Sequence, residues 1–419
     1  MQVILVVNSQ MPLSFRASRS NKNIGTLPYI PGTSLLGGLA AAYIRMRQGS
    51  SGFEDEFARF FTSGDISFGN LYPANFQSDK SKNDDLADDE LSIRPIPATV
   101  RSCKDFSGFL FQNKKDDDDD EKHGVFDELI PWTLFALSRQ KATDVFDAGR
   151  QCSVCHKRTA PFSGFYRRNF EMNAIGASNP KRRMITRTGI SRKRGAVMEE
   201  ILYHREVLSE NQDFWGILDV QDDTLWDDFE EFFDEAFDNE AVYLGNNKTR
   251  GMGKIGHTSL IPITEPDDTE DNLKKRVGDF GSKLKQMAAE HNLTAPHAYY
   301  IPITLQSDAI LRDDLMRYQS AITPDDLKKA WNLKDMELIY HNVSTSRVMG
   351  WNPLTGLPRA DGMAMAMGSV FLFGFNGNAD DLFWQILSEI QTKGIGERRH
   401  HGFGRIMIAE PFHLEVNPL

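Results

Sequence analysis

The sequence predicts a mixed α+β protein in which a ferredoxin-like βαββαβ unit occurs twice in tandem. The first observation is a motif, G-x5-G-x-G-(K/R)-I, found at 245–255 and again at 396–406. The second is that an apolar run and an amphipathic helical pattern precede each copy, and a further apolar run follows it. We expect each copy of a repeated pattern to form the same supersecondary unit, so the repeat decides the predicted architecture.

The first unit is expected within residues 1–265. Its opening sequence MQVILVVNS predicts a strand, DFWGILDV (213–220) predicts another, and LWDDFEEFFDEAF (225–237) has apolar residues at helical spacing. KIGHTSLIPI, directly after the first glycine motif, predicts the closing strand. Near the start, Pro31 and Gly32 indicate a turn, and Thr33 or Ser34 is a candidate N-cap for a helix rich in small residues.

The second unit is expected within residues 298–419. TLQSDAIL (304–311) resembles VVNSQMPL of the first unit and predicts the opening strand. SVFLFGF (369–375) predicts a strand, DDLFWQILSEIQ (380–391) a helix, and RIMIAEPFHL after the second glycine motif a closing strand. We interpret residues 266–297 as a linker.

Residues from about 50 to 170 do not fit the six elements of a ferredoxin-like unit, so we predict that they form an insertion. This segment contains all three cysteines of the chain. A C-x2-C pair, a third thiol and an imidazole form a Cys3His set, which is typical of structural zinc because four protein ligands leave no open coordination position. The predicted ligands are Cys103, His123, Cys152 and Cys155. His156 is an alternative fourth ligand, and a redox-active C-x2-C pair is an alternative role.

Composition is consistent with a soluble cytoplasmic protein. At 419 residues, 40% of them hydrophobic, the chain can bury two cores, and no apolar run approaches the roughly 18 residues of a membrane helix. The three cysteines favour a reducing compartment over a disulfide scaffold. The first residues lack the basic flank and cleavage site of a secretory signal. We expect no membrane partner.

The net charge of −11 is unevenly distributed along the chain. Residues 219–239 hold ten Asp or Glu and no Lys or Arg, whereas 181–194 hold seven Lys or Arg and no acid. Local field matters more than total charge for an anionic ligand, so the basic segment predicts nucleic-acid contact. A solvated basic face is the alternative. The predicted contacts are Lys181, Arg182, Arg183, Arg187, Arg192, Lys193 and Arg194.

The two glycine motifs predict loops that bind a phosphodiester backbone. Glycine permits positive φ and lets another molecule approach the main chain without meeting a Cβ. The alternative is a pair of turns whose glycines relieve strain and whose charges are solvated. The predicted contacts in the first loop are Gly245, Lys248, Arg250, Gly251, Gly253 and Lys254. Those in the second loop are Gly396, Arg398, Arg399, His400, His401, Gly402, Gly404 and Arg405.

These features together resemble the RAMP superfamily of CRISPR-associated proteins. The resemblance rests on the two glycine loops, IPGTSLLGGLA (30–40), the basic segment leading into ILYHREVLSENQDFWGILDV (201–220), and CSVCHKRTAPFSGFY (152–166). Within the superfamily, the zinc knuckle and doubled fold are most similar to the Csx-ten family, the Cas-five-type subunit of type III-D effector complexes. The fold that the resemblance implies is a pair of RRM-related, ferredoxin-like domains.

The resemblance also implies a function and partners. It implies a ribonucleoprotein complex in antiviral defence, in which this subunit holds the repeat-derived 5′ end of CRISPR RNA. The large polymerase-like subunit and backbone RAMP subunits would be its protein partners, and target RNA a further one. Many relatives read IPGSSLKG where this chain has Leu36 in place of the lysine, which removes one implied phosphate contact.

Some RAMP proteins are endoribonucleases, so catalysis has to be considered. His400 and His401 are adjacent histidines in a basic loop and could act as acid and base, but nothing else in the sequence completes such a site. We therefore expect an RNA-binding subunit with no catalytic residues. The alternatives are an endoribonuclease that processes precursor CRISPR RNA and an assembly protein that contacts only other subunits.

Overall fold

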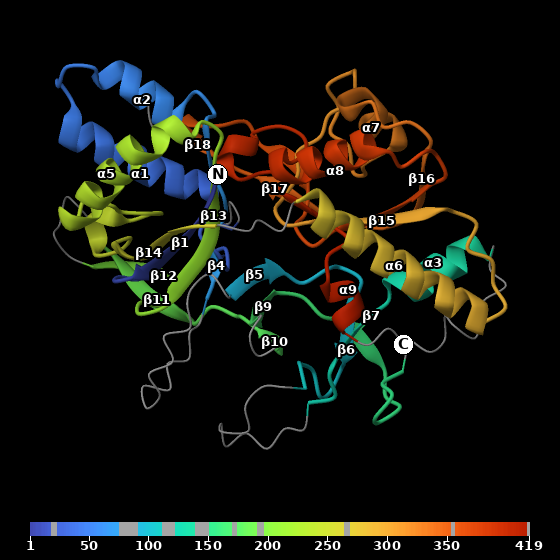
Figure 1. Ribbon diagram of the computed structural model, residues 1–419. Coiled ribbons are helices and arrows are strands. Elements are labelled where there is room, and N and C mark those ends of the chain that lie inside the picture. Colours follow the sequence, from blue (N-terminus) through green and yellow to red (C-terminus); the bar gives the residue numbers. More distant parts are fainter. Residues whose placement is uncertain are drawn as a thin grey trace.

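The computed structural model describes residues 1–17, 23–74, 91–110, 122–138, 151–169, 174–190, 197–263, 269–352 and 357–416. Helices and several antiparallel sheets make up this part of the chain, so the predicted mixed α+β class is confirmed (Figure 1). The predicted RNA contacts Arg192, Lys193 and Arg194 lie outside the described residues. The division into tandem domains stays a prediction.

The first large sheet has the strand order β14-β1-β13-β3, with β4 also paired to β13. Its strands are β1 (Gln2–Ser9), β3 (Ile66–Phe68), β4 (Tyr72–Pro73), β13 (Asp213–Val220) and β14 (Ile255–Pro262). Its helices are α1 (Gly32–Arg47), α2 (Phe53–Phe61) and α5 (Trp226–Asp238). In chain order this gives the spatial order 4-1-3-2 of a βαββαβ unit. The predicted strand at 213–220 and the following helix are present.

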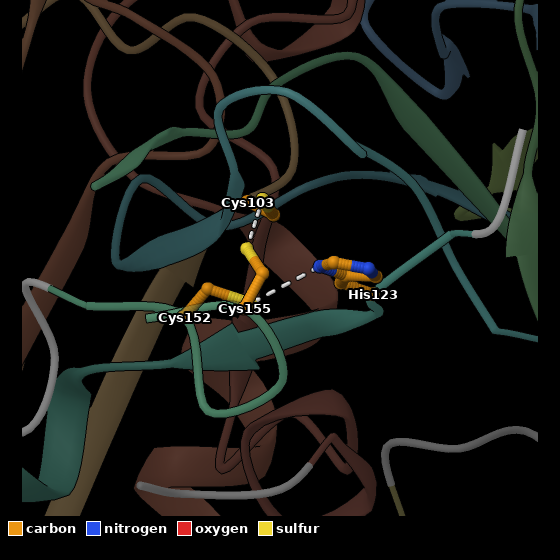
Figure 2. Close-up of side chains that lie close together, drawn as sticks. All are labelled: Cys103, His123, Cys152 and Cys155. Atoms are coloured by element: carbon orange, nitrogen blue, oxygen red, sulfur yellow. Dashed lines mark hydrogen bonds between the residues drawn. The ribbon is translucent and has the colours of Figure 1, made fainter. Parts of the chain in front are cut away.

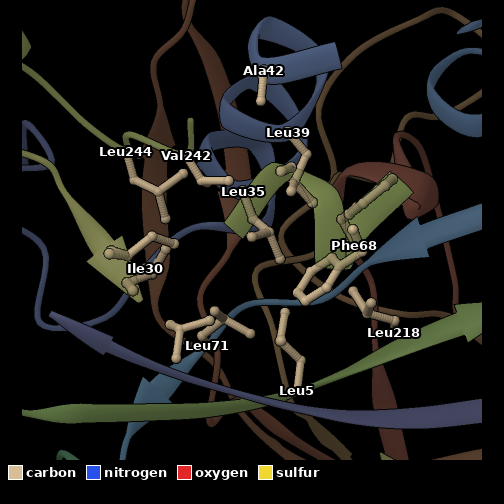
Figure 3. Packing of buried hydrophobic residues seen from close by; sticks show 14 of the residues in the cluster. Leu5, Ile30, Leu35, Leu39, Ala42, Phe68, Leu71, Leu218, Val242 and Leu244 are labelled. Atoms are coloured by element: carbon tan, nitrogen blue, oxygen red, sulfur yellow. The ribbon is translucent and has the colours of Figure 1, made fainter. Parts of the chain in front are cut away.

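Alternating apolar residues give the first sheet two buried faces. Leu5 packs toward Leu35 and Leu39 of α1 and toward Phe68 of β3, as Figure 3 shows. Ile4, Val6 and Trp215 belong to a separate cluster on the other face. The helices therefore cover one face of this sheet and leave the other for a different part of the chain.

Helix α1 begins without the predicted side-chain cap. Pro31 is the N-cap residue, so the prediction that Thr33 or Ser34 caps the helix is wrong. The Gly32 N–H, one of the first-turn donors without a partner inside the helix, donates to Oδ1 of Asn70 at 2.9 Å. A methyl group on Gly32 would lie only 2.0 Å from the Phe68 carbonyl oxygen, so this glycine allows the helix to approach β3 closely.

The second large sheet repeats the arrangement in the order β16-β21-β15-β22. Its strands are β15 (Tyr299–Leu305), β16 (Met336–Asn342), β21 (Val370–Phe375) and β22 (Ile406–Ile408), with helices α7 (Pro324–Trp331) and α8 (Asp381–Lys393). The closing strand is much shorter than the predicted RIMIAEPFHL, because Ala409 directly after it has a positive φ of 47° and the short helix α9 (Phe412–Glu415) follows. The opening strand begins five residues before the predicted 304–311 segment.

The segment 266–297, predicted as a linker, contains the long helix α6 (Glu270–Glu290). Leu273 and Val277 join the core beneath α8, while Phe280 and Leu284 join the core on the opposite face of the second sheet. The segment is therefore part of the second core and not a spacer. Its buried residues recur at helical spacing, which is the pattern of an amphipathic helix, so the linker prediction overlooked a signal that the sequence carries.

The predicted bounds of the insertion, about 50–170, are wrong at both ends: residues 53–73 form α2, β3 and β4 of the first unit, and the insertion runs from β5 to β10. It covers the remaining faces of both large sheets. It contains β5 (Leu91–Pro95), β6 (Val100–Cys103), β7 (Val125–Asp127), α3 (Leu129–Leu137), β8 (Thr159–Pro161), β9 (Phe165–Asn169) and β10 (Ala174–Ala177). Ile93 and Phe165 pack in the cluster of Ile4 and Trp215 on the first sheet. Helix α3 packs against the second sheet, where Leu134 shares a core with Leu372.

Three hairpins complete the described fold. The basic segment forms β11 (Arg182–Ile190), which pairs with β12 (Val197–Leu208), and β2 (Asn23–Ile24) pairs with β12. The other hairpins join β17 (Thr345–Val348) to β20 (Gly362–Met365) and β18 (Trp351–Asn352) to β19 (Leu357–Pro358). None of the helices in the described ranges is long and apolar enough to cross a membrane.

Candidate metal centre and nucleic-acid interface

The structure brings Cys103, His123, Cys152 and Cys155 together (Figure 2). Their ligand atoms all lie within 4.8 Å of one another. The Cys103 and Cys155 sulfurs are 3.6 Å apart, and the Cys152 sulfur lies 3.3 Å from Nδ1 of His123. Cys103 ends β6, His123 precedes β7, and the C-x2-C pair forms the turn before β8, so one small sheet holds the four groups.

The donor set fits a tetrahedral metal ion. Zinc–sulfur bonds of about 2.3 Å place tetrahedral sulfurs roughly 3.8 Å apart, close to the separation of Cys103 and Cys155. Burial raises the pKa of the Cys103 thiol, but hydrogen bonds from the backbone of Phe106 and Asp105 outweigh it and lower the pKa to about 7. Such a thiol is readily converted to the thiolate that a metal requires. His123, and not His156, belongs to the described cluster.

The basic segment on β11 is partly neutralised by its neighbour β12. Arg182 lies 3.5 Å from the Glu206 carboxylate, and Arg183 lies 2.9 Å from that of Glu210. The expectation of seven uncompensated cations is therefore wrong for these two, because strand pairing supplies acids from elsewhere in the sequence. Arg187 differs, since its Nη2 donates to the Arg250 carbonyl oxygen at 3.3 Å. This contact joins the hairpin to the first glycine loop.

The first glycine loop lies beside the C-terminal end of α1. Lys248 is exposed, yet partial desolvation of its ammonium group, and then the charge of Arg45, lower its pKa. Lys254 is paired with Glu240 at 2.7 Å. Four cations around this loop are called the first-loop surface: Arg45, Arg187, Lys248 and Arg250. Arg45 was not among the predicted contacts, and its only signal in the sequence is its place in a basic helix end.

The glycines of the first loop have different surroundings. Gly245, Gly251 and Gly253 all have positive φ, of 75°, 73° and 96°. A methyl group on Gly245 would lie 2.6 Å from the Ser14 carbonyl oxygen, and one on Gly253 would lie 2.6 Å from that of Leu244. Beside Gly251 there is no described atom within 4 Å. Only this glycine leaves room for another molecule to approach.

The second glycine loop packs against the first sheet. The Ser67 hydroxyl donates to the Arg399 carbonyl oxygen at 2.9 Å, and Arg405 forms an ion pair with Asp219. A methyl group on Gly402 would lie 2.6 Å from the Phe68 carbonyl oxygen, and one on Gly404 only 1.8 Å from that of Ile395. Gly396 is similarly confined. Intramolecular packing thus gives these three glycines a role without any ligand.

Helix α1 separates the two loops. A methyl group built on Gly32, at its first turn, would lie 2.9 Å from the His401 carbonyl oxygen, whereas Arg45 near its end adjoins Lys248. An α-helix rises about 20 Å between those two positions. The loops that we predicted as one set of contacts therefore form two separate regions.

The adjacent histidines lie in a positive environment. Their ring centres are 4.1 Å apart. Burial, followed by the charges of His400, Arg359 and Arg398, lowers the pKa of His401 to about 4. Burial also lowers the pKa of His400. A group with a pKa near 4 is neutral at pH 7 and is a weak base there.

A family profile described as the RAMP superfamily matches residues 18–255, more than half of the chain. The chain belongs to the RAMP superfamily. This confirms the resemblance at superfamily level, while the Csx-ten assignment stays a prediction. No curated protein matches the sequence.

Several solved structures resemble this RAMP protein weakly. A type III-B Cmr-beta complex with cognate target RNA contains a chain 10% identical, with 97% of this chain and 96% of that chain covered and a TM-score of 0.41. A chain of a Cmr-beta complex with cognate target RNA and AMPPnP is 10% identical, with 88% of this chain and 86% of that chain covered and a TM-score of 0.38. Thermus thermophilus Cas6 is 12% identical, with 47% of this chain and 74% of that chain covered and a TM-score of 0.28. The family assignment rests on the profile match alone.

Proposed function

We propose that this RAMP protein is an RNA-binding subunit of a type III-D-like CRISPR effector complex. In that role it holds the repeat-derived 5′ end of the guide RNA and contacts the large polymerase-like subunit and backbone RAMP subunits. The observation that carries the proposal is the first-loop surface. Four Lys or Arg side chains gather there from α1, β11 and the glycine loop of a chain with a net charge of −11.

This surface is suited to phosphates more than to bases. Arginine and lysine neutralise the backbone and fix its position, and such contacts carry no sequence information directly. RRM-type domains read bases by stacking them on an open sheet face. Here Ile93 and Phe165 cover that face of the first sheet, and Leu134 packs on the second. The proposed contacts are therefore electrostatic and depend on salt.

We propose that the protein binds RNA without cleaving it, and the two histidines are part of the reason. With its pKa lowered to about 4 by burial and the neighbouring positive charges, His401 is a weak general base. Beside an exposed Arg399, it can contribute contacts and shape without chemistry. Endoribonuclease action on precursor CRISPR RNA is the competing function that the experiment must address.

The proposed zinc ion is structural. Cys103, His123, Cys152 and Cys155 would supply all four ligands, which leaves no position for substrate or water. When bound, the ion would cross-link β6, the segment before β7 and the turn before β8. These elements belong to the insertion that covers both large sheets.

One incubation distinguishes the functions. Labelled repeat RNA and purified protein, without added catalytic metal, are followed by gel shift and by denaturing gel. The proposal expects a shifted complex containing intact RNA. Cleavage that disappears in His401→Ala would establish the endoribonuclease, and absence of any complex would favour an assembly protein. Arg317→Ala is a matched control, because Arg317 is exposed but paired with Asp313 at 2.7 Å.

A further inference from the structure

The metal centre is also a place where two thiols lie close enough to react with each other. The chain has three cysteines, and all of them belong to the cluster with His123. All three are free thiols. Neighbouring thiols can be oxidised to a disulfide when they hold no metal ion. Which disulfide forms depends on which two sulfurs the fold brings together.

The cluster is divided into two close contacts. The sulfurs of Cys103 and Cys155 are 3.6 Å apart, whereas the Cys152 sulfur contacts Nδ1 of His123 at 3.3 Å. Cys152 also lies within 4.8 Å of the other two sulfurs, so its thiol is the competitor for any bond. The close thiol contact nevertheless joins the end of β6 to the turn before β8, and not the two cysteines of the C-x2-C pair.

Backbone and surface contacts hold the two segments together without a metal ion. Strand β6, which ends at Cys103, pairs with β8. The Lys104 N–H donates to the Arg158 carbonyl oxygen at 3.1 Å, and Lys157 is paired with Asp105 at 2.6 Å. None of these contacts uses a ligand atom of the cluster. The close approach of Cys155 to Cys103 is therefore a property of the fold itself.

Exposure decides which sulfur an oxidant reaches first. Cys103 and Cys152 are 1% and 3% exposed, whereas Cys155 is partly exposed. The Cys155 thiolate attacks one oxygen of hydrogen peroxide and displaces hydroxide, which gives a sulfenic acid. The Cys103 thiolate then attacks this sulfur, forms the disulfide and displaces a second hydroxide. The two sulfurs lose two electrons in total, and with two protons these reduce one peroxide to two waters.

We propose that Cys103 and Cys155 form a peroxide-sensitive disulfide that replaces the metal ion in the insertion. The disulfide takes away two of the four ligands, so zinc is released. It keeps β6 joined to the turn before β8, whereas His123, before β7, loses its cross-link. The inference is independent of RNA binding and rests on the proposed zinc site only for the release of the ion.

The test treats the full chain with hydrogen peroxide, both as purified and after removal of metal with a chelator. Released zinc is measured, remaining thiols are blocked with N-ethylmaleimide, and tryptic peptides are identified by mass spectrometry. Trypsin leaves Cys103 in residues 102–104 and the C-x2-C pair in residues 151–157. A disulfide between Cys103 and Cys155 thus joins two peptides, whereas one within the C-x2-C pair does not.

We expect release of about one zinc per chain, joined peptides that carry the blocking group on Cys152, and reversal by dithiothreitol with added zinc. Cys152→Ser keeps the reacting pair, so it should form the same disulfide although it lacks one metal ligand. Hydrogen exchange in the oxidised parent should become faster in residues 122–127 and stay slow in residues 151–161, because only the first segment loses a cross-link.

Any disulfide that includes Cys152 as the main product would overturn the assigned pair. Peroxide that produces no disulfide, with or without metal, would overturn the proposal as a whole. Joined peptides in a chain that contains no zinc when purified would retain the disulfide and contradict the zinc site instead.

Discussion

Gly251 and Gly402 occupy the same position of the repeated glycine motif but have different surroundings. Both have positive φ, of 73° and 87°. Gly251 has free space beside its Cα, whereas a methyl group on Gly402 would meet the Phe68 carbonyl oxygen at 2.6 Å. One motif thus serves two purposes, access in the first loop and close packing in the second.

Alanine substitution should separate these purposes. Gly251→Ala incurs only the strain of a left-handed residue, about 1–2 kcal/mol in the free energy of unfolding. Gly402→Ala adds a backbone clash and should destabilise the protein more. Denaturant unfolding of the two variants measures the difference. Equal destabilisation would contradict the packing role of Gly402.

A buried ion pair between two residues, His413 and Asp127, predicts that the stability of the fold depends on pH. The Nδ1 and Oδ2 atoms are 2.6 Å apart, and the side chains are 0% and 1% exposed. Burial lowers the pKa of His413, but the charge and hydrogen bond of Asp127 outweigh it and raise the pKa above its usual value. The pair therefore stabilises the fold fully below the unfolded histidine pKa of about 6.5, and this is lost as pH rises through the folded pKa.

Unfolding by denaturant between pH 6 and 9 checks this sign. We expect the parent to lose stability toward higher pH relative to His413→Gln, which cannot titrate. Parallel pH profiles for the two proteins would show that the pair contributes no such dependence.

Among the helices and strands, those with a clear local pattern of apolar residues were predicted correctly from the sequence. Residues 213–220 and the following helix form as predicted, because their apolar spacing is unambiguous. Helix α6 was missed although its buried residues have helical spacing. Strand β22 ends early because Ala409 has a positive φ of 47°, which the local apolar pattern does not indicate. The Glu206 partner of Arg182 could not be predicted, since the register of β11 on β12 is a property of the folded hairpin.

That register predicts which hairpin cations matter for RNA. Arg182→Ala removes a cation already close to Glu206, whereas Arg187→Ala removes one that adjoins Arg250 in the first-loop surface. We expect the second substitution to weaken repeat RNA binding more than the first. Fluorescence anisotropy at a fixed salt concentration compares them. A larger effect of Arg182→Ala would place the RNA at the Arg182 end of β11 instead.

At the scale of the whole molecule, the insertion joins the two large sheets. The donor set of the metal centre was predicted correctly from residue types, although the bound ion stays a proposal. What sequence could not indicate is where the insertion packs. The contacts of Ile93 with the first sheet, Leu134 with the second and Asp127 with His413 connect segments far apart in the chain.

Metal removal should therefore disturb more than the insertion. We expect about one zinc per chain, as for a single four-ligand site. Cys152→Ser should lower both the metal content and the melting temperature. It should also speed hydrogen exchange in α9, which Asp127 contacts through His413. Unchanged metal content and melting temperature would rule out the site. Faster exchange confined to 100–161 would rule out the connection to α9.

Binding of RNA through phosphate contacts of the first-loop surface makes the affinity depend on salt. The most direct measurement is the salt dependence of repeat RNA affinity for the parent, for Lys248→Ala combined with Arg250→Ala, and for the Arg317→Ala control. The slope of log K against log salt should fall by about 0.7 for each lost contact on a single strand. We expect a flatter slope for the double variant alone, because only that variant loses contacts of the first-loop surface. An unchanged slope in that variant, at unchanged affinity, would contradict RNA binding at this surface.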